Sequence, residues 1–353
     1  MKQRNRKVIL ILYTELAGYT LASLAAAAVE AEIHLIRWPV NEEAPFRFDF
    51  DKAIHVYNRH ELSTEKLFKL ADEINPDLIL CSGWTDKSYL AVCKAWRKKI
   101  PVVLAMDNKW QGTPRQHFAR LIARYTILRY FSDCWVPGRQ QMIYAEKLGF
   151  AKQKIKTGFY TCDVGHFTQV YTESRQEKER SFPHVFIYAG RYYDFKGVEE
   201  LWNAFIRMKQ MQESDWKLVC LGVGDIKPAE HPAITHEGFI QPEKLDEVMR
   251  RTGVFILPSR VEPWGVVVQE FGAAGFPLLL SNAVGAADTF LQDGKNGFLF
   301  KPNDVDSLIM AMQSVVELPD THLVEMGRKS TELAAGINPE RWANTLLSFI
   351  PRS

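Results

Sequence analysis

Two glutamates, Glu262 and Glu270, lie eight positions apart where a short apolar run gives way to a helix-like pattern. The run ends at Leu257, a loop carries Glu262, and Gly265 precedes the helical stretch. The first turn of a helix presents unpaired N–H groups and the positive end of the helix dipole. A glycine there lets a ligand approach the backbone closely. The segment predicts an anion site suited to a diphosphate, with solvated or capping glutamates as the alternative.

Two cations, Arg191 and Lys196, follow Gly190 at the end of another apolar run. Arginine can bind phosphate through two parallel hydrogen bonds, and lysine supplies a point charge. Such a pair could stabilise the charge that develops on a leaving diphosphate. The alternative is a pair of surface cations that cap helix ends. A third segment closes a strand with Gly222 and Gly224, which alone is weak evidence for a phosphate-binding turn.

Short strand-like runs alternate with helical patterns along the chain. Runs that are apolar throughout, such as 8–12, are typical of strands covered on both faces. In the first half, strands are expected at 7–13, 32–37, 53–57, 77–81, 101–105 and 133–136, and helices at 19–30, 64–74, 86–97, 115–130 and 139–148. This alternation predicts a parallel sheet with helices on both sides.

A polar, charge-rich stretch at 171–180 is expected to be an interdomain linker. The alternation then restarts, with strands at 184–189, 216–221, 254–257, 277–280 and 297–300 and helices at 197–211, 241–250, 265–274 and 305–316. A last helix has Asn338 as its N-cap and Pro339 in its first position. Two α/β domains in tandem are expected, with ligands at the carboxyl ends of the strands.

The bulk composition places the chain among globular proteins. The net charge is +2, but basic residues outnumber acidic ones up to Gly165 and the balance reverses beyond it. This asymmetry favours an anionic partner for the first half, with an unevenly charged solvated surface as the alternative. Five cysteines without a CxxC pattern favour a reducing compartment. The apolar run at 8–12 is too short to span a membrane, so we expect a cytoplasmic protein without a cleaved signal peptide.

The segment from Glu262 to Glu270 resembles the Glu-x7-Glu motif of retaining glycosyltransferases of the GT-B fold, family 4. The resemblance continues through Gly275 to Pro277 and through Asp293 and its neighbours. It implies an α/β fold with two Rossmann-like domains that face a cleft. An acceptor-binding domain is expected at 1–167, with 338–353 returning to it, and a donor-binding domain at 168–337.

The resemblance also implies roles for individual residues. Glu262 is expected to approach the donor sugar, and Glu270 to bind the ribose hydroxyls of the nucleotide. Arg191 and Lys196 are expected to hold the diphosphate. The remaining residues expected at the donor are Gly18, Gly190, Gly222, Gly224, Phe239, Ile240, Pro263, Trp264, Gly265 and Val266, of which the last two present backbone N–H groups to the phosphates.

The first domain departs from the family pattern at two positions. Members of the family commonly have a histidine where this chain has Asp107, which could orient or deprotonate an acceptor hydroxyl or could be a turn residue. The loop after the first strand often has two glycines in the family, and this chain has Ala17 and Gly18. The acceptor-side chemistry is therefore the less determined part of the site.

The implied reaction moves a sugar with retention from a nucleoside diphosphate, UDP or GDP, to a hydroxyl of a saccharide or lipid-linked acceptor. Glycolipid or polysaccharide assembly is the common setting in the family. No cofactor and no metal are expected, because two cations and a helix terminus can neutralise the diphosphate. Asp49 and Asp51 form a DxD pattern typical of metal sites in another transferase fold, but here they are expected to lead into a strand.

A basic helix in the first half could contact anionic lipid on the inner face of a membrane. It carries Arg115, Arg120, Arg124 and Arg129 together with apolar residues such as Phe118 and Leu121. The alternative is a core-facing helix with a solvated basic side. Nucleic acid is not an expected partner, because no recognised binding module is present.

Two other functions remain open at this stage. A nucleotide-sugar epimerase of the same architecture would act without an acceptor. The other is a non-catalytic sugar-nucleotide-binding protein, against which the intact set of Arg191, Lys196, Glu262 and Glu270 argues, and which would keep part of its role without Lys196.

Overall fold

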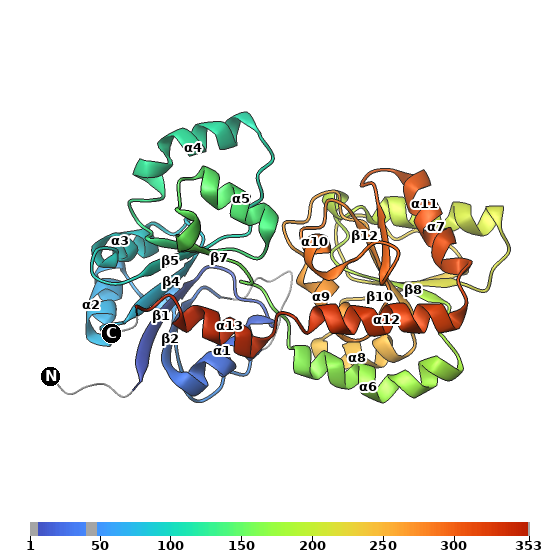
Figure 1. Cartoon of the computed structure of the whole chain (residues 1–353), viewed down its shortest axis with the longest axis horizontal. Coiled ribbons are helices and arrows are strands. Elements are labelled where there is room, and N and C mark those ends of the chain that lie inside the picture. The colour runs from blue at the N-terminus through green and yellow to red at the C-terminus, as the bar shows by residue number, and fades with distance from the viewer. Residues whose placement is uncertain (1–5, 40–47, 352–353) are drawn as a thin grey trace. The chain divides into compact units, whose positions relative to one another are not determined.

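The computed structural model describes residues 6–39 and 48–351. The chain divides into two compact units, Met1–Cys162 with Ile337–Ser353, and Asp163–Gly336 (Figure 1). The sequence-based boundaries were placed a few residues later in each case. Both units are α/β with parallel sheets, so the expected fold class is confirmed.

The first unit is built on a seven-stranded parallel sheet in the order β3-β2-β1-β4-β5-β6-β7. The strands are β1 (Lys7–Tyr13), β2 (Ala31–Arg37), β3 (Ile54–Asn58), β4 (Leu78–Ser82), β5 (Val102–Ala105), β6 (Asp133–Trp135) and β7 (Ile155–Lys156). The helices are α1 (Thr20–Glu30), α2 (Thr64–Ile74), α3 (Lys87–Trp96), α4 (Pro114–Thr126) and α5 (Arg139–Lys147), and short turns η1 (Arg59–Glu61) and η2 (Lys152–Lys154) complete the unit.

Alternate residues of β1 enter two different hydrophobic cores. Leu10 and Leu12 pack in the core that also holds residues of α2, α3 and α5. Ile9 and Ile11 pack in the opposite core, which holds residues of α1 and the last helix. Burial on both faces explains why the strand is apolar at every position.

The last helix, α13 (Pro339–Leu347), completes the first unit. The side chain of Asn338 caps it by accepting a hydrogen bond from the Arg341 N–H at 2.8 Å. The Trp342 Nε1–H donates to the Phe159 carbonyl at 2.6 Å, and the Trp342 ring lies 4.9 Å from that of Trp135. Helices α1 and α13 lie side by side over one face of the sheet (Figure 1).

The second unit has a six-stranded parallel sheet in the order β10-β9-β8-β11-β12-β13. The strands are β8 (Val185–Ala189), β9 (Lys217–Leu221), β10 (Ile234–Gly238), β11 (Val254–Leu257), β12 (Leu278–Ser281) and β13 (Gly297–Phe300). The helices are α6 (Val164–Arg180), α7 (Val198–Met211), α8 (Pro242–Arg250), α9 (Val266–Ala273), α10 (Ala287–Phe290), α11 (Val305–Val316) and α12 (Asp320–Ala334), with the 3-10 turn η3 (Asp194–Lys196) after β8.

The expected linker at 171–180 is wrong, because these residues form most of helix α6. The carboxylate of Asp163 caps the helix by accepting a hydrogen bond from the His166 N–H at 3.1 Å. Val170, Ser174 and Lys178 face the interior of the unit. Helix α12 and the short strands β7 and β10 had no counterpart among the expected elements.

The strand order reverses direction once in each sheet, between β1 and β4 and between β8 and β11. Ligands in such sheets bind outside the carboxyl ends of the strands at these switch points. Ligand-binding sites are therefore expected in the loops that follow β1, β4, β8 and β11. Within the described ranges, no helix has the length and apolar character needed to cross a bilayer.

Candidate functional site

An ion pair joins the loops after β8 and β11 in the second unit. The Lys196 ammonium donates to Glu262 Oε2 at 2.5 Å, and the Ser259 hydroxyl donates to the same oxygen at 3.3 Å. The two charged side chains are only 16% and 11% exposed. Two residues 66 positions apart, both predicted from the sequence, thus meet at the switch point of this sheet.

The loop that carries Glu262 is fixed by backbone hydrogen bonds to the segment after β12. The Gly285 N–H donates to the Glu262 carbonyl at 3.1 Å, and the Ala286 N–H donates to the Trp264 carbonyl at 2.9 Å. The loop ends at Gly265, whose φ of +92° is unfavourable for residues with a side chain. A Cβ there would lie 3.2 Å from Cγ of Glu262. This glycine brings the start of α9 directly beside the Glu262 side chain.

Helix α9 begins at Val266 without a side-chain cap. Its first turn therefore presents backbone N–H groups and positive dipole charge next to the Lys196–Glu262 pair. This geometry suits an anion, as the sequence predicted. Glu270 lies one turn further along the same helix, and its removal from water raises its pKa to about 7. The nearby His166 counteracts this shift only in part.

The backbones of three strand-end loops come unusually close around two of the predicted glycines. A Cβ on Gly222 would lie 1.9 Å from the Gly190 carbonyl oxygen, and one on Gly224 would lie 2.4 Å from the carbonyl oxygen of Tyr192. The Gly222 N–H also donates to the Gly238 carbonyl at 2.7 Å. Both glycines are required for this packing of loops, whatever they contact in a ligand.

The other predicted donor residues differ in exposure. Arg191 is exposed, with its guanidinium carbon 5.3 Å from the centre of the Tyr193 ring. Phe239 is 38% exposed, and Ile240 and Pro263 are partly exposed. Trp264 is 2% exposed and packs against Phe290, so only its main chain is near the surface.

Sequence reasoning missed Arg260, which holds the two charged loops together. Its guanidinium donates to Asp194 at 2.8 Å and also contacts Glu200. Its backbone N–H donates to the Phe195 carbonyl at 2.9 Å. These contacts tie the turn that carries Lys196 to the loop that carries Glu262. The signal available in the sequence was a further cation beside the Glu-x7-Glu segment.

The first unit contains a pocket of about 1020 Å³ at the carboxyl ends of β1, β4 and β5. Asp107 lines it and accepts a hydrogen bond from the Tyr160 hydroxyl at 3.2 Å. Burial raises the pKa of Tyr160, and the charges of Tyr19 and Asp107 add to this effect. Gly18 lies in the loop after β1, between the pocket-lining residues Ala17 and Tyr19. Both residues predicted in the first half are thus at or beside one pocket.

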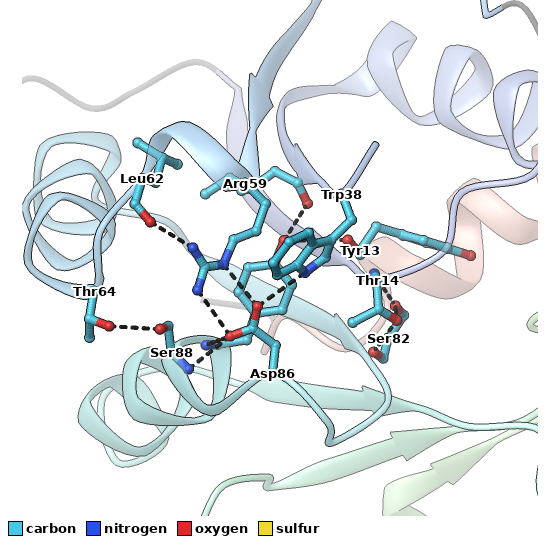
Figure 2. Close-up of polar contacts among 11 residues, drawn as sticks. Tyr13, Thr14, Trp38, Arg59, Leu62, Thr64, Ser82, Asp86 and Ser88 are labelled. Atoms are coloured by element: carbon cyan, nitrogen blue, oxygen red, sulfur yellow. Dashed lines mark hydrogen bonds and ion pairs between the residues drawn. The ribbon is translucent and has the colours of Figure 1, made fainter. Parts of the chain in front are cut away.

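A partly buried group of polar contacts lies beside this pocket, which Thr14 and Ser82 line (Figure 2). Arg59 donates to Asp86 at 2.8 Å, and Trp38 Nε1 donates to the same carboxylate at 3.1 Å. Burial alone would raise the pKa of Asp86, but the hydrogen bonds from Arg59 and from the first N–H groups of α3 hold it below its usual value. The Thr14 N–H donates to the hydroxyl of Ser82 at 2.9 Å and joins the ends of β1 and β4. The sequence analysis did not find this network.

The DxD pattern has a local structural role. The carboxylate of Asp51 accepts a hydrogen bond from the Ala53 N–H at 2.8 Å in the turn before β3, as expected of a loop that leads into a strand. One group in the described ranges, Glu32, His34 and His55 on β2 and β3, could converge on a metal ion. It contains none of the residues predicted for the site.

The fold and the second-unit site define a two-domain α/β protein of the GT-B type. A solved structure with this fold is that of Anabaena Alr3699/HepE in complex with UDP-glucose, with a TM-score of 0.68 and 16% identity. The comparison covers 97% of this chain and 98% of that one. The profile of the family described as glycosyl transferases group 1 matches residues 170–332. The match covers most of the second unit, which is therefore similar to that family.

Curated relatives match parts of the chain. Glycogen synthase of Mycobacterium tuberculosis is 29% identical over 151 residues, which are 40% of this chain and 36% of that protein. An uncharacterized 41.2 kDa protein in the cps region of Klebsiella pneumoniae is 21% identical over 252 residues, 69% of this chain and 62% of that protein. Among the first curated relatives, the matches span only 19% to 36% of their own lengths.

Proposed function

We propose that the protein is a glycosyltransferase that moves a sugar from a nucleoside diphosphate to an acceptor hydroxyl. The observation that carries this proposal is the Lys196–Glu262 pair beside the uncapped start of α9. A cation, a carboxylate and a helix terminus then lie within one small region. This set can bind a diphosphate and a polyhydroxylated sugar together.

The proposed reaction exchanges one bond of the sugar for another. The bond from the anomeric carbon to the diphosphate oxygen breaks, and a bond from that carbon to the acceptor oxygen forms. The acceptor proton passes to the departing diphosphate, so no oxidant is needed. Lys196 and the exposed Arg191 stabilise the charge on the leaving oxygen, which is where positive groups lower the barrier most. Glu262 positions the sugar hydroxyls, and Glu270 binds the ribose.

The finer assignments follow from the family resemblance and the site. We infer retention of the anomeric configuration, with the diphosphate acting as the base. UDP is the first candidate nucleotide, since the Anabaena neighbour binds UDP-glucose, and GDP is the second. The positive groups of the site supply the charge that a metal would otherwise supply, so we infer a metal-independent reaction.

The acceptor is proposed to bind in the first-unit pocket, where Asp107 orients its hydroxyl. We place the enzyme in the cytoplasm, in polysaccharide or glycolipid assembly. Its five cysteines are all buried free thiols, which supports a reducing compartment. The name of the Klebsiella relative refers to a cps region, which is compatible with this setting.

A thermal-shift screen against UDP, GDP, ADP and their sugar conjugates, with and without EDTA, tests the donor site. A ligand that binds only the folded state raises the melting temperature, by an amount that grows with its concentration. We expect a shift with one nucleoside diphosphate that EDTA does not change. A shift that EDTA abolishes would contradict the metal-free site, and no shift with any nucleotide would contradict the proposal.

Replacement of Lys196 distinguishes an enzyme from a protein that only binds a sugar nucleotide. Lys196→Ala removes a cation from the developing charge and should lower kcat by about 10²- to 10³-fold. The exposed Lys217→Ala at the start of β9 is the matched control and should leave kcat unchanged. Turnover retained in Lys196→Ala would contradict the assignment, and conversion of the donor to an epimer without acceptor would identify the epimerase instead.

A further inference from the structure

Helix α4 of the first unit exposes an apolar row that a globular protein normally buries. Phe118, Leu121 and Tyr125 are 62%, 77% and 67% exposed. Their spacing places them on one side of the helix. Of the residues of α4, only Ala123 is fully buried. In Figure 1 the helix stands off from the strands of its own unit.

The charges around this row have one sign. From Asn108 to Ser132 the chain has Lys109 and four arginines, and no Asp or Glu. Arg120 and Arg124 are exposed on the helix itself. Apolar side chains flanked by cations on one helix are the combination that binds the surface of an anionic bilayer.

A second pocket, of about 400 Å³, lies beneath α4. Ile122 and Thr126 line it from the helix, and Leu90 and Leu148 line it from the body of the unit. Most of its lining side chains are apolar. Its volume is within the range of sites for small ligands.

The two pockets of the first unit are neighbours, because Trp84, Ala119 and Tyr144 line both. The larger pocket has a mixed lining that includes the charged side chains of Asp107 and Arg115, whereas most side chains that line the smaller one are apolar. A molecule that occupied both would need a polar head joined to an apolar chain.

We propose that the acceptor is a lipid-linked, anionic molecule, which the first unit takes from a bilayer on which α4 docks. The head, with its phosphate near Arg115, occupies the larger pocket, and the start of its hydrocarbon chain occupies the smaller one. This inference rests on the proposed glycosyl transfer and names the class of its acceptor. It also gives a role to the exposed row on α4.

Cosedimentation of the full chain with vesicles tests the docking. We expect binding at low salt to vesicles of phosphatidylcholine mixed with phosphatidylglycerol, and little binding to phosphatidylcholine alone. The double variant Arg120→Gln with Arg124→Gln should bind about tenfold more weakly, and so should Phe118→Asn with Leu121→Asn. A wild-type protein that stays in solution with the mixed vesicles at low salt overturns the proposal.

Matched controls exclude general effects of charge and hydrophobicity. Lys66→Gln with Lys69→Gln removes two exposed cations from α2, and Val29→Asn removes an exposed apolar side chain from α1. Both controls should bind vesicles as the wild type does. An equal loss of binding in the controls would overturn the assignment to α4.

Soluble alkyl phosphates test whether the smaller pocket binds a hydrocarbon chain. Calorimetry should show that decyl phosphate binds at least about tenfold more tightly than methyl phosphate, since its chain leaves water. Ile122→Trp fills the pocket from α4 and should remove this difference. Equal affinity for the two probes in the wild type overturns the lipid-linked assignment. The thermal shift with UDP or GDP reports on the second unit, so a failure of the proposed function remains distinguishable.

Discussion

Glu270 and Lys178 are ionisable side chains that the second unit withdraws from water, with opposite consequences for pH dependence. Burial raises the pKa of Glu270 to about 7 and lowers that of Lys178 to about 7. Lys178 Nζ has no hydrogen-bond partner within the described ranges and lies 3.9 Å from the centre of the Phe276 ring. Glu270 belongs to the candidate site, whereas Lys178 lies on α6 among interior residues.

Glu270 should make donor binding depend on pH. The ribose hydroxyls need the ionised carboxylate as an acceptor, so affinity should fall up to tenfold per unit as the pH drops below about 7. Calorimetric titration with a UDP-sugar measures this, because a diphosphate diester does not titrate in that range. Glu270→Gln should bind more weakly and without the pH dependence. The same pH dependence in the variant would contradict the role.

The same substitution should affect stability in the opposite direction. The folded pKa of Glu270 is raised above the unfolded value, so the free energy of unfolding falls as the pH rises from about 4.5 to about 7. Glu270→Gln should therefore be more stable than wild type at pH 8, by about 1 to 2 kcal/mol, and similar at pH 4. Urea denaturation at the two pH values checks this. A variant that is less stable at pH 8 would contradict the prediction.

Lys178→Met should stabilise the second unit. The folded pKa of this lysine is lowered, so the cost of its charge is fully present below about pH 7 and disappears as the pH rises toward 10.5. We expect a gain on the order of 2 kcal/mol at pH 6 that shrinks at pH 10. Urea denaturation measures the gain, with the exposed Lys69→Met as control. A gain of equal size at both pH values would point to packing rather than charge.

Residue types singled out Lys196 and Glu262, which the structure brings together, but not the contact between them. The roles of these residues and of Arg191 in binding the donor stay predictions, based on charged groups at a glycine turn or a helix start. That Lys196 bonds to Glu262 required the fold, since the two are distant in sequence. The burial of Trp264 could not be predicted from its own segment. It depends on residues after β12, which only the folded chain brings onto this loop.

At the scale of elements, the strands were the most predictable features. Strands such as β1 and β4 are apolar throughout because both faces are covered, and this pattern is visible in the sequence. Helix α6 was missed because two of its inward positions are Ser174 and Lys178, which hide the helical period. Its exposed side is rich in charge, and such composition also occurs in linkers.

The loop after β9 should tolerate no side chain at Gly222. An added Cβ would overlap the Gly190 carbonyl oxygen, and the φ of +137° adds backbone strain. Gly222→Ala should destabilise the protein by more than about 2 kcal/mol in urea denaturation. Gly18→Ala is the control, because nothing lies within 4 Å of its Cβ position, and its cost should be within about 0.5 kcal/mol. Equal stability of the two variants would contradict the packing of these loops.

At the scale of the whole molecule, the first unit is assembled from two distant stretches of chain. Trp342 of α13 is 2% exposed and packs on Trp135. Trp342→Ala should destabilise the first unit by about 3 to 5 kcal/mol, because it leaves a large cavity. Calorimetry of the variant should show that the first unit unfolds at a lower temperature than in the wild type. The melting temperature of the second unit, which is the transition that the nucleotide shifts, should not change.

Asn344→Ala on the exposed side of α13 is the control and should change neither transition. If Trp342→Ala lowered the temperature of one single transition, the two units would unfold together. This result would contradict the prediction that each unit unfolds cooperatively by itself.

The position of α13 has a consequence for synthesis on the ribosome. The second unit is continuous in sequence and can fold as soon as its last strand and helices have emerged. The first unit emerges earlier, but until residues 339–347 appear it lacks α13, which is one of the two helices that cover one face of its sheet. The apolar face beneath α13 stays uncovered while the second unit is made. The half that is translated first is therefore the half that matures last.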